Sequence, residues 1–148
     1  MRTLAIDFGS RRVGLALSDE GGKFSSPYDV LTIGNPEQAK SEVLAVVRKE
    51  GVTRLVVGLP LNMDDSIGPA ARDTITWATA LGREARLWPI FIDERLSSFA
   101  AEQALIDRKR GGEKITRGQR KQRLDALAAS AFLQEFLDGK LQPIQIDD

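Results

Sequence analysis

The segment Thr3-Leu4-Ala5-Ile6-Asp7-Phe8-Gly9 places a single aspartate in a run that is otherwise apolar and that ends at a glycine. Such a run is typical of a short strand followed by a tight turn. Residues 12–18 follow and carry apolar side chains at alternate positions, which predicts a second strand with one buried face. We expect a third strand over residues 29–33. Because the connections are short, the three strands should form an antiparallel meander.

Helices and strands alternate through the rest of the chain. Asn35 and Pro36 suit the N-cap and first position of a helix, and Gly51 should end it. The other elements that we expect are strands over residues 54–58 and 87–92 and helices over about residues 69–81, 98–107 and 119–137. This order, βββαβαβα, predicts an α/β fold in which helices flank a mixed five-stranded sheet. Ligand sites in such folds gather at the C-terminal ends of the strands.

The length and hydropathy of the chain set its broad class. The 148 residues fit one domain, 1–148, with a substantial core. No apolar run approaches the roughly 18 residues that would span a bilayer. The first residues lack the long apolar stretch and the small-residue cleavage site of a signal peptide. We therefore expect a cytoplasmic protein without a membrane partner.

Two residue types are missing from the sequence, and their absence narrows the chemistry. There is no cysteine, which excludes disulfides, zinc–thiolate sites and thiol nucleophiles. There is no histidine, which excludes the commonest general base and the commonest transition-metal ligand. Acid–base work would fall to carboxylates, lysines, hydroxyls or metal-bound water. Carboxylate oxygens suit hard ions such as Mg²⁺ and Mn²⁺.

Positive charge is concentrated in residues 108–123, which we call the basic segment. The chain as a whole has a net charge of zero, whereas this segment has eight basic residues and one acid, Glu113. Its net charge is +7, and the rest of the chain carries −7. A basic stripe on a neutral protein suits an anionic partner such as nucleic acid. The alternative is a solvated basic loop without a partner.

Three acids are candidates for a shared site. Asp7 lies inside an apolar strand, where a charge is costly unless it is paired or bound to metal, although it could also cap the turn that follows. Glu94 follows a predicted strand, and both it and Asp93 could instead favour the positive end of the next helix. Asp125 lies in an early turn of the last predicted helix, where small residues nearby would let the helix approach the sheet, or it is an ordinary solvated acid. If the three converge, two divalent ions between them could bind a scissile phosphate without histidine or cysteine.

Four short motifs carry a resemblance to a known family that covers nearly the whole chain. They occur in order as Asp7-Phe8-Gly9 with Gly14 and Ala16, Val57-Gly58-Leu59-Pro60, Asp93-Glu94-Arg95-Leu96, and Asp125-Ala126-Leu127-Ala128-Ala129. With these motifs the chain resembles the YqgF family, also called RuvX, of Holliday junction resolvase-like pre-16S rRNA nucleases. The resemblance implies a ribonuclease H-like fold. It also implies a catalytic, metal-binding triad of Asp7, Glu94 and Asp125.

The resemblance further implies where the nucleic acid would lie. Gly9, Arg95 and the loop from Leu59 to Asn62 would line the active site or position the backbone. After the Asp93-Glu94-Arg95-Leu96 motif, where relatives often have threonines, this chain has Ser97 and Ser98. In the loop after the strand expected over residues 54–58, where relatives commonly have glycine, it has Asp65-Ser66, which predicts a stiffer loop. The residues that we expect to contact nucleic acid are Gly9, Asn62, Arg95, Ser97, Ser98, Arg108, Lys109, Arg110, Lys114, Arg117, Arg120, Lys121 and Arg123.

The resemblance implies a metal-dependent nuclease that matures the 5′ end of pre-16S rRNA, using Mg²⁺ or Mn²⁺. A resolvase of four-way DNA junctions is the alternative enzyme, and it would need a homodimer with paired sites. A nucleotide-binding phosphotransfer protein shares the Asp7-x-Gly9 start but would need two such domains. A nucleic-acid adaptor that uses the basic segment alone is the non-enzymatic alternative. Structured RNA or branched DNA would be the partner.

Overall fold

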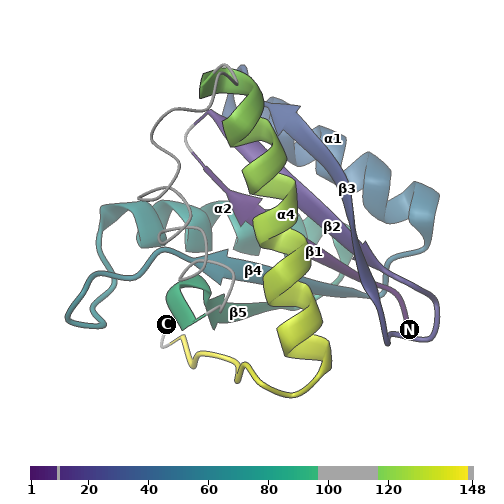
Figure 1. Cartoon of the computed structure of the whole chain (residues 1–148). Coiled ribbons are helices and arrows are strands. Elements are labelled where there is room, and N and C mark those ends of the chain that lie inside the picture. The colour runs from purple at the N-terminus through teal and green to yellow at the C-terminus, as the bar shows by residue number, and fades with distance from the viewer. Residues whose placement is uncertain (10, 97–116, 147–148) are drawn as a thin grey trace.

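The structure, a computed structural model, describes residues 1–9, 11–96 and 117–146, and of residues 117–125 the backbone alone. One sheet and the helices on its two faces make up the described chain (Figure 1). The strands are β1 (Thr3–Phe8), β2 (Arg12–Ser18), β3 (Ser25–Thr32), β4 (Arg54–Leu59) and β5 (Pro89–Asp93). The helices are α1 (Pro36–Glu50), α2 (Pro69–Ala85), the short 3-10 helix η1 (Glu94–Leu96) and α4 (Arg117–Leu137).

The sheet is mixed and has the order β3-β2-β1-β4-β5. The first three strands form the predicted antiparallel meander, with Asp7 opposite Gly14 in the β1–β2 pair. The strands β1, β4 and β5 are parallel. Their C-terminal ends therefore meet at one edge of the sheet, where Asp7 and Glu94 lie. The predicted α/β fold with a mixed five-stranded sheet is confirmed.

Helix α1 begins and ends where its local sequence predicts. The Asn35 side chain accepts a hydrogen bond from the Gln38 backbone N–H, and Pro36 occupies the first turn. Gly51 adopts φ 65°, in the left-handed region that glycine enters without a steric penalty, and closes the helix. The buried face of α1 includes Ala39 and Val43.

Helices α1 and α2 cover one face of the sheet (Figure 1). The larger core cluster contains Leu4 and Ile6 of β1 together with residues of β4, α1 and α2. Trp77 of α2 ties the layer together, because its ring stacks on Phe8 with 4.5 Å between centroids and its Nε1 donates to the Pro36 carbonyl. None of the described helices is long and apolar enough to cross a membrane.

Helix α4 covers the opposite face and crosses β1, β2 and β3 (Figure 1). Its buried residues pack against Ala5, Ala16, Val56 and Ile92, and they are Ala126, Ala129, Phe132 and Leu133. Leu127, by contrast, is 42% exposed. Small residues at 126 and 129 let the helix lie close to the sheet.

Several element boundaries differ from those predicted. β3 begins at Ser25 rather than at 29, because Pro27 can be accommodated in an outer strand, next to a register shift at which Leu15 and Ala16 of β2 pair with Asp29 and Pro27. α4 begins at Arg117, so the last part of the basic segment is helical. The helix predicted over residues 98–107 lies outside the described residues.

Candidate active site

Asp7 and Glu94 lie on the same face of the sheet, the one that α4 covers. Side chains alternate between the faces of a strand, and Ala5 belongs to the core cluster under α4, so Asp7 points to that face as well. Ile92 belongs to the same cluster, and Glu94 follows it by two residues. Both acids are partly buried. The strand ends thus bring together two acids that are 87 positions apart in the sequence.

Gly58 of β4 separates the two acids. It follows Val57, which pairs with Ile6, so it lies beside Asp7 in the neighbouring strand. A Cβ atom at position 58 would lie 2.9 Å from Glu94 Oε2 and 3.1 Å from Phe132 Cε2. Gly14 lies on the other side of Asp7. Both strand neighbours of Asp7 therefore lack a side chain, and the Glu94 side chain and the Phe132 ring lie over Gly58.

The backbone contact of Gly9 explains why a glycine stands at this position. Its backbone N–H donates to the Arg12 carbonyl at 2.8 Å, which closes the β1–β2 turn directly after Asp7. A Cβ at position 9 would lie 2.9 Å from that same carbonyl oxygen. The Arg12 carbonyl therefore leaves no room for a side chain at position 9. The tight turn holds the end of β1 and so fixes the backbone beside Asp7.

Asp93 and Glu94 are adjacent but have different surroundings. Asp93 is buried, and its carboxylate accepts hydrogen bonds from the backbone N–H and the guanidinium of Arg95. The Arg95 side chain beside it lowers the pKa of Asp93 below its ordinary value. Asp93 therefore serves the local structure as a charged hydrogen-bond acceptor. Glu94 instead turns toward Gly58 and α4.

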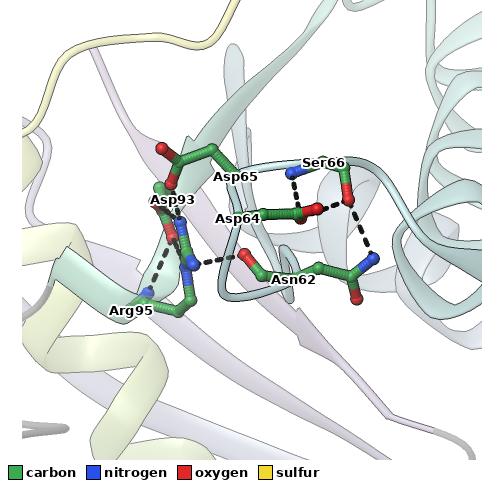
Figure 2. Close-up of polar contacts among 6 residues, drawn as sticks. All are labelled: Asn62, Asp64, Asp65, Ser66, Asp93 and Arg95. Carbon is green, nitrogen blue, oxygen red and sulfur yellow. Dashed lines mark hydrogen bonds and ion pairs between the residues drawn. The ribbon is translucent and has the colours of Figure 1, made fainter.

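Arg95 links the end of β5 to the loop 59–68, which connects β4 to α2 (Figure 2). Its guanidinium binds Asp93 at 2.8 Å and Asp65 at 2.6 Å, and it also donates to the Asn62 carbonyl. We call these contacts the Arg95 clamp. They raise the pKa of Arg95 further above its ordinary value. Arg95, which we expected to position nucleic acid, makes these hydrogen bonds to its own protein.

Short polar contacts within the loop fix its shape (Figure 2). Asn62 donates to the Ser66 hydroxyl, and Ser66 donates to the Asp64 carboxylate from both its backbone and its side chain. These bonds lower the pKa of Asp64. Asp65 adopts φ 67°, a left-handed conformation that is uncommon for residues other than glycine. The ion pair with Arg95 accompanies this strained backbone, in line with the stiff loop that the sequence predicts.

The remaining predicted site residues lie either in the first part of α4, of which the backbone alone is described, or outside the described residues. Position 125 is in α4, one turn before Ala129 and two turns before Phe132, and its side chain is not described. The same holds for Arg117, Arg120, Lys121 and Arg123. Ser97, Ser98, Arg108, Lys109, Arg110 and Lys114 lie outside the described residues. Within the described part, no group of three or more acidic, histidine or cysteine side chains could hold a metal ion.

Sequence reasoning missed two features of this site. Gly58 entered it only as part of a family motif, although its position after an apolar strand run signals a place where a side chain does not fit. The pairing of Asp93 and Asp65 with Arg95 joins residues 30 positions apart, and no local pattern indicates it. Both features depend on which strands are neighbours.

The sheet order and the acids at its C-terminal edge define the class of protein, which has the ribonuclease H-like fold. RuvC of Thermus thermophilus in complex with a Holliday junction substrate aligns over 97% of this chain and 100% of that chain, with a TM-score of 0.60 and 14% identity. RuvC of the same organism in a second structure gives a TM-score of 0.58. At this identity the likeness concerns the fold alone, and it confirms the expected architecture.

Sequence comparison identifies the family. The family model of RuvX, described as Holliday junction resolvase, matches residues 1–139, and the chain belongs to this family. A relative in Acidiphilium cryptum named "Putative pre-16S rRNA nuclease" is 44% identical over 142 residues, which are 96% of this chain and 87% of the relative. A relative of the same name in a Roseiflexus species is 40% identical, over 94% of this chain and 95% of its own length. The family is thus one of nucleases, as the motifs indicated.

Proposed function

We propose that this protein is a divalent-metal-dependent nuclease that hydrolyses phosphodiester bonds of precursor 16S rRNA during maturation of its 5′ end. The observation that carries the proposal is the placement of Asp7 and Glu94 on one sheet face with Gly58 between them. The names of the relatives support RNA as the substrate.

The proposed metal ligands are Asp7, Glu94 and Asp125. The first two are carboxylates, the donors that Mg²⁺ and Mn²⁺ prefer. The helical spacing supports the third, because residues four and seven positions apart share a helix face and both Ala129 and Phe132 pack on the sheet. Two ions bound there would stabilise the charge on a scissile phosphate and lower the pKa of an attacking water. The chain has no histidine that could act as the general base in place of a metal-bound water.

Within this proposal, Arg95 is a positioning residue for the loop 59–68. The clamp sets the distance of that loop from the end of β5, directly beside Glu94. The clamp also holds the Asn62 carbonyl. The loop would then meet the nucleic-acid backbone with its shape already set, which reduces the entropy lost on binding.

The test compares the wild type with Asp7→Asn on precursor 16S rRNA and on a four-way DNA junction, with Mg²⁺, Mn²⁺ or chelator. Asp7→Asn should reduce cleavage roughly 100-fold or more, since a metal ion contributes several kcal/mol of charge stabilisation. Binding to the RNA should remain. The matched control is Asp73→Asn, which removes an exposed acid from α2 and should cleave normally.

Each result selects one function. Cleavage of the RNA that chelator abolishes supports the proposal. Paired, symmetric cuts in the junction by a stable homodimer, with no cut in the RNA, would make the protein a resolvase, the activity in the family's description. Undiminished biological activity of Asp7→Asn would make it a nucleic-acid adaptor.

A further inference from the structure

A groove of about 650 Å³ lies far from the candidate active site. One wall is the C-terminal half of α2 and the other is the terminal segment 143–146. This segment lies along the outer strand β5, because the Ile144 N–H donates to the Phe91 carbonyl at 2.7 Å. The volume falls in the range of roughly 300–1,000 Å³ that is usual for small-molecule sites. The groove is therefore large enough for a nucleobase.

An exposed tryptophan lines the groove. Trp88 stands between α2 and β5 with 85% of its surface exposed, whereas Trp77, the other tryptophan, is 7% exposed and lies in the core. The exposed indole ring is a good stacking platform for a nucleobase. The surrounding lining is largely apolar and includes Ile75, Phe91 and Ile144.

The charges at the groove favour an anion. Arg83 and Arg86 line it, and none of the described lining residues is acidic. The neighbouring acid on α2, Glu84, is engaged by Lys40 at 3.4 Å and is not among the lining residues. Neither arginine forms an ion pair with another described residue. Two cations beside one aromatic ring are the elements of a site for single-stranded nucleic acid.

We propose that this groove binds the single strand that flanks the cleaved bond, with a base stacked on Trp88 and phosphates bound by Arg83 and Arg86. The inference rests on the proposed function, since it places a second contact on the same substrate. Trp88 precedes β5 and Glu94 follows it, so the two ends of the footprint are about 20 Å apart at roughly 3.3 Å per residue. A stacked strand rises about 3.4 Å per nucleotide, so it needs at least about six nucleotides to cover that span. This number is a minimum, because the groove is walled by α2 while the two acids face α4, and the strand must pass around the edge at β5.

Binding is measured in Asp7→Asn protein, which binds without cutting, by tryptophan fluorescence where Trp88 is present and by fluorescence anisotropy of a dye-labelled oligouridylate for every variant. Oligouridylate longer than the span should quench Trp88 emission. In a Trp88→Phe variant the remaining Trp77 emission should not change, while the Phe ring keeps part of the affinity. Trp88→Ala should weaken binding about five-fold to a hundred-fold, the range expected for one stacked base. Arg83→Gln with Arg86→Gln should also weaken it and flatten its salt dependence.

Matched controls remove similar groups elsewhere. Phe24→Ala deletes another exposed aromatic, 68% exposed, beside β3 at the far side of the sheet from β5. Arg48→Gln with Lys49→Gln removes the same charge from the last turn of α1. Both should bind oligouridylate as the parent protein does. Equal losses in the controls would overturn the assignment of the groove.

A cleavage assay separates this inference from the proposed function. On a substrate whose flank exceeds the span, Trp88→Ala should raise KM about as much as it weakens binding and leave kcat at the wild-type value. The difference in KM from the wild type should vanish when the flank is trimmed to one nucleotide.

Wild-type cleavage with no quenching and no flank-dependent KM overturns the assignment of the groove, while the proposed nuclease function stands. Quenching without any cleavage supports the groove and overturns the nuclease. A Trp88-dependent self-association without quenching makes the groove a protein interface and overturns the inference.

Discussion

At the scale of single residues, the candidate site depends on the side chains that are missing as much as on the acids. Asp7 has glycine on both neighbouring strands, Gly14 in β2 and Gly58 in β4. The Glu94 carboxylate occupies part of the space that a side chain at 58 would fill. A side chain at position 58 would collide with Glu94, so glycine there lets the Glu94 carboxylate lie over β4, on the same face of the sheet as Asp7.

Gly58→Ala tests this arrangement. The new methyl would lie 2.9 Å from Glu94 Oε2 and 3.1 Å from Phe132 Cε2, so Glu94 or α4 must move. We expect the free energy of unfolding to fall by about 1–3 kcal/mol, as for other overpacked sites. Cleavage should fall on the order of 100-fold, because a ligand displaced by about 1 Å loses its alignment.

The control for Gly58→Ala is Gly21→Ala. At position 21 the nearest atom to an added Cβ is 3.5 Å away, an ordinary contact, so denaturant unfolding and cleavage should match the wild type. Wild-type cleavage by Gly58→Ala would show that the space between the acids is not used.

At this scale the strand pattern makes Asp7 conspicuous but does not tell Asp93 and Glu94 apart, and only the family resemblance selects Glu94. An aspartate in an apolar strand is conspicuous by itself, because burying a charge is costly. Two adjacent acids at a strand end look alike in a sequence. Their roles separate only in three dimensions, where alternation turns Asp93 toward Arg95 and Glu94 toward Gly58.

At the scale of elements, the Arg95 clamp connects the 3-10 helix η1 to the end of β5 and to the loop 59–68 (Figure 2). The loop lies about thirty residues earlier in the sequence. The loop carries an exposed apolar tip, Met63, with 99% of its surface exposed. Its own short hydrogen bonds and the clamp together restrict its conformations, which lowers the entropy that binding would otherwise cost.

The clamp makes stability depend on pH through Asp93. Arg95 lowers the pKa of Asp93 in the folded protein below the ordinary value of 3.8. The stabilisation is therefore complete above that ordinary pKa and is lost as the pH falls through the lowered value. Asp93→Asn should cost about 1.5 kcal/mol at neutral pH, the lower end for a hydrogen bond to a charged group, because Arg95 is partly exposed.

Denaturant unfolding from pH 7 down to pH 2 measures this effect. The difference between wild type and Asp93→Asn should be constant at neutral pH and shrink below about pH 4, near the ordinary pKa of a free aspartate. Asp29→Asn, an exposed acid of β3, is the control and should follow the wild type. A difference that persists unchanged at the lowest pH would mean that the carboxylate charge does not hold the clamp.

Helix α1 and strand β3 show what local sequence can and cannot predict about elements. α1 has its signals within its own sequence, a capping Asn35 and a terminal Gly51, and the structure follows both. β3 is an outer strand, and its first half contains Pro27 and two serines, which lack the apolar alternation of a strand. It forms because β2 and α4 hold it, with Ser25 donating to the Ser130 carbonyl. Such tertiary contacts override local preference.

At the scale of the whole molecule, topology assembles the site. The parallel strands β1, β4 and β5 place their C-terminal ends together, as the alternation of helices and strands predicts. The sequence did not predict that the terminal segment 143–146 covers the outer edge of β5. That segment has no helix or strand periodicity, and its position follows from the hydrogen-bonding groups that an outer strand leaves open.

The uneven charge of the molecule leads to a prediction about binding. The basic segment carries +7 and the rest of the chain −7, so it is the strongest attraction for a polyanion while the remainder repels one. Each phosphate contact that a basic residue makes releases a counterion, which contributes about 0.7 to the salt slope on a single strand and about 0.9 on duplex DNA. Changing Arg108, Lys109 and Arg110 to glutamine should therefore lower the slope of log K against log salt by about two to three on precursor rRNA. Binding isotherms over a range of salt concentrations measure the slope, with Arg48→Gln and Lys49→Gln, which remove two positive charges outside the basic segment, as the control. An unchanged slope in the triple variant, with the same affinity as the control, would mean that these three residues do not touch the substrate.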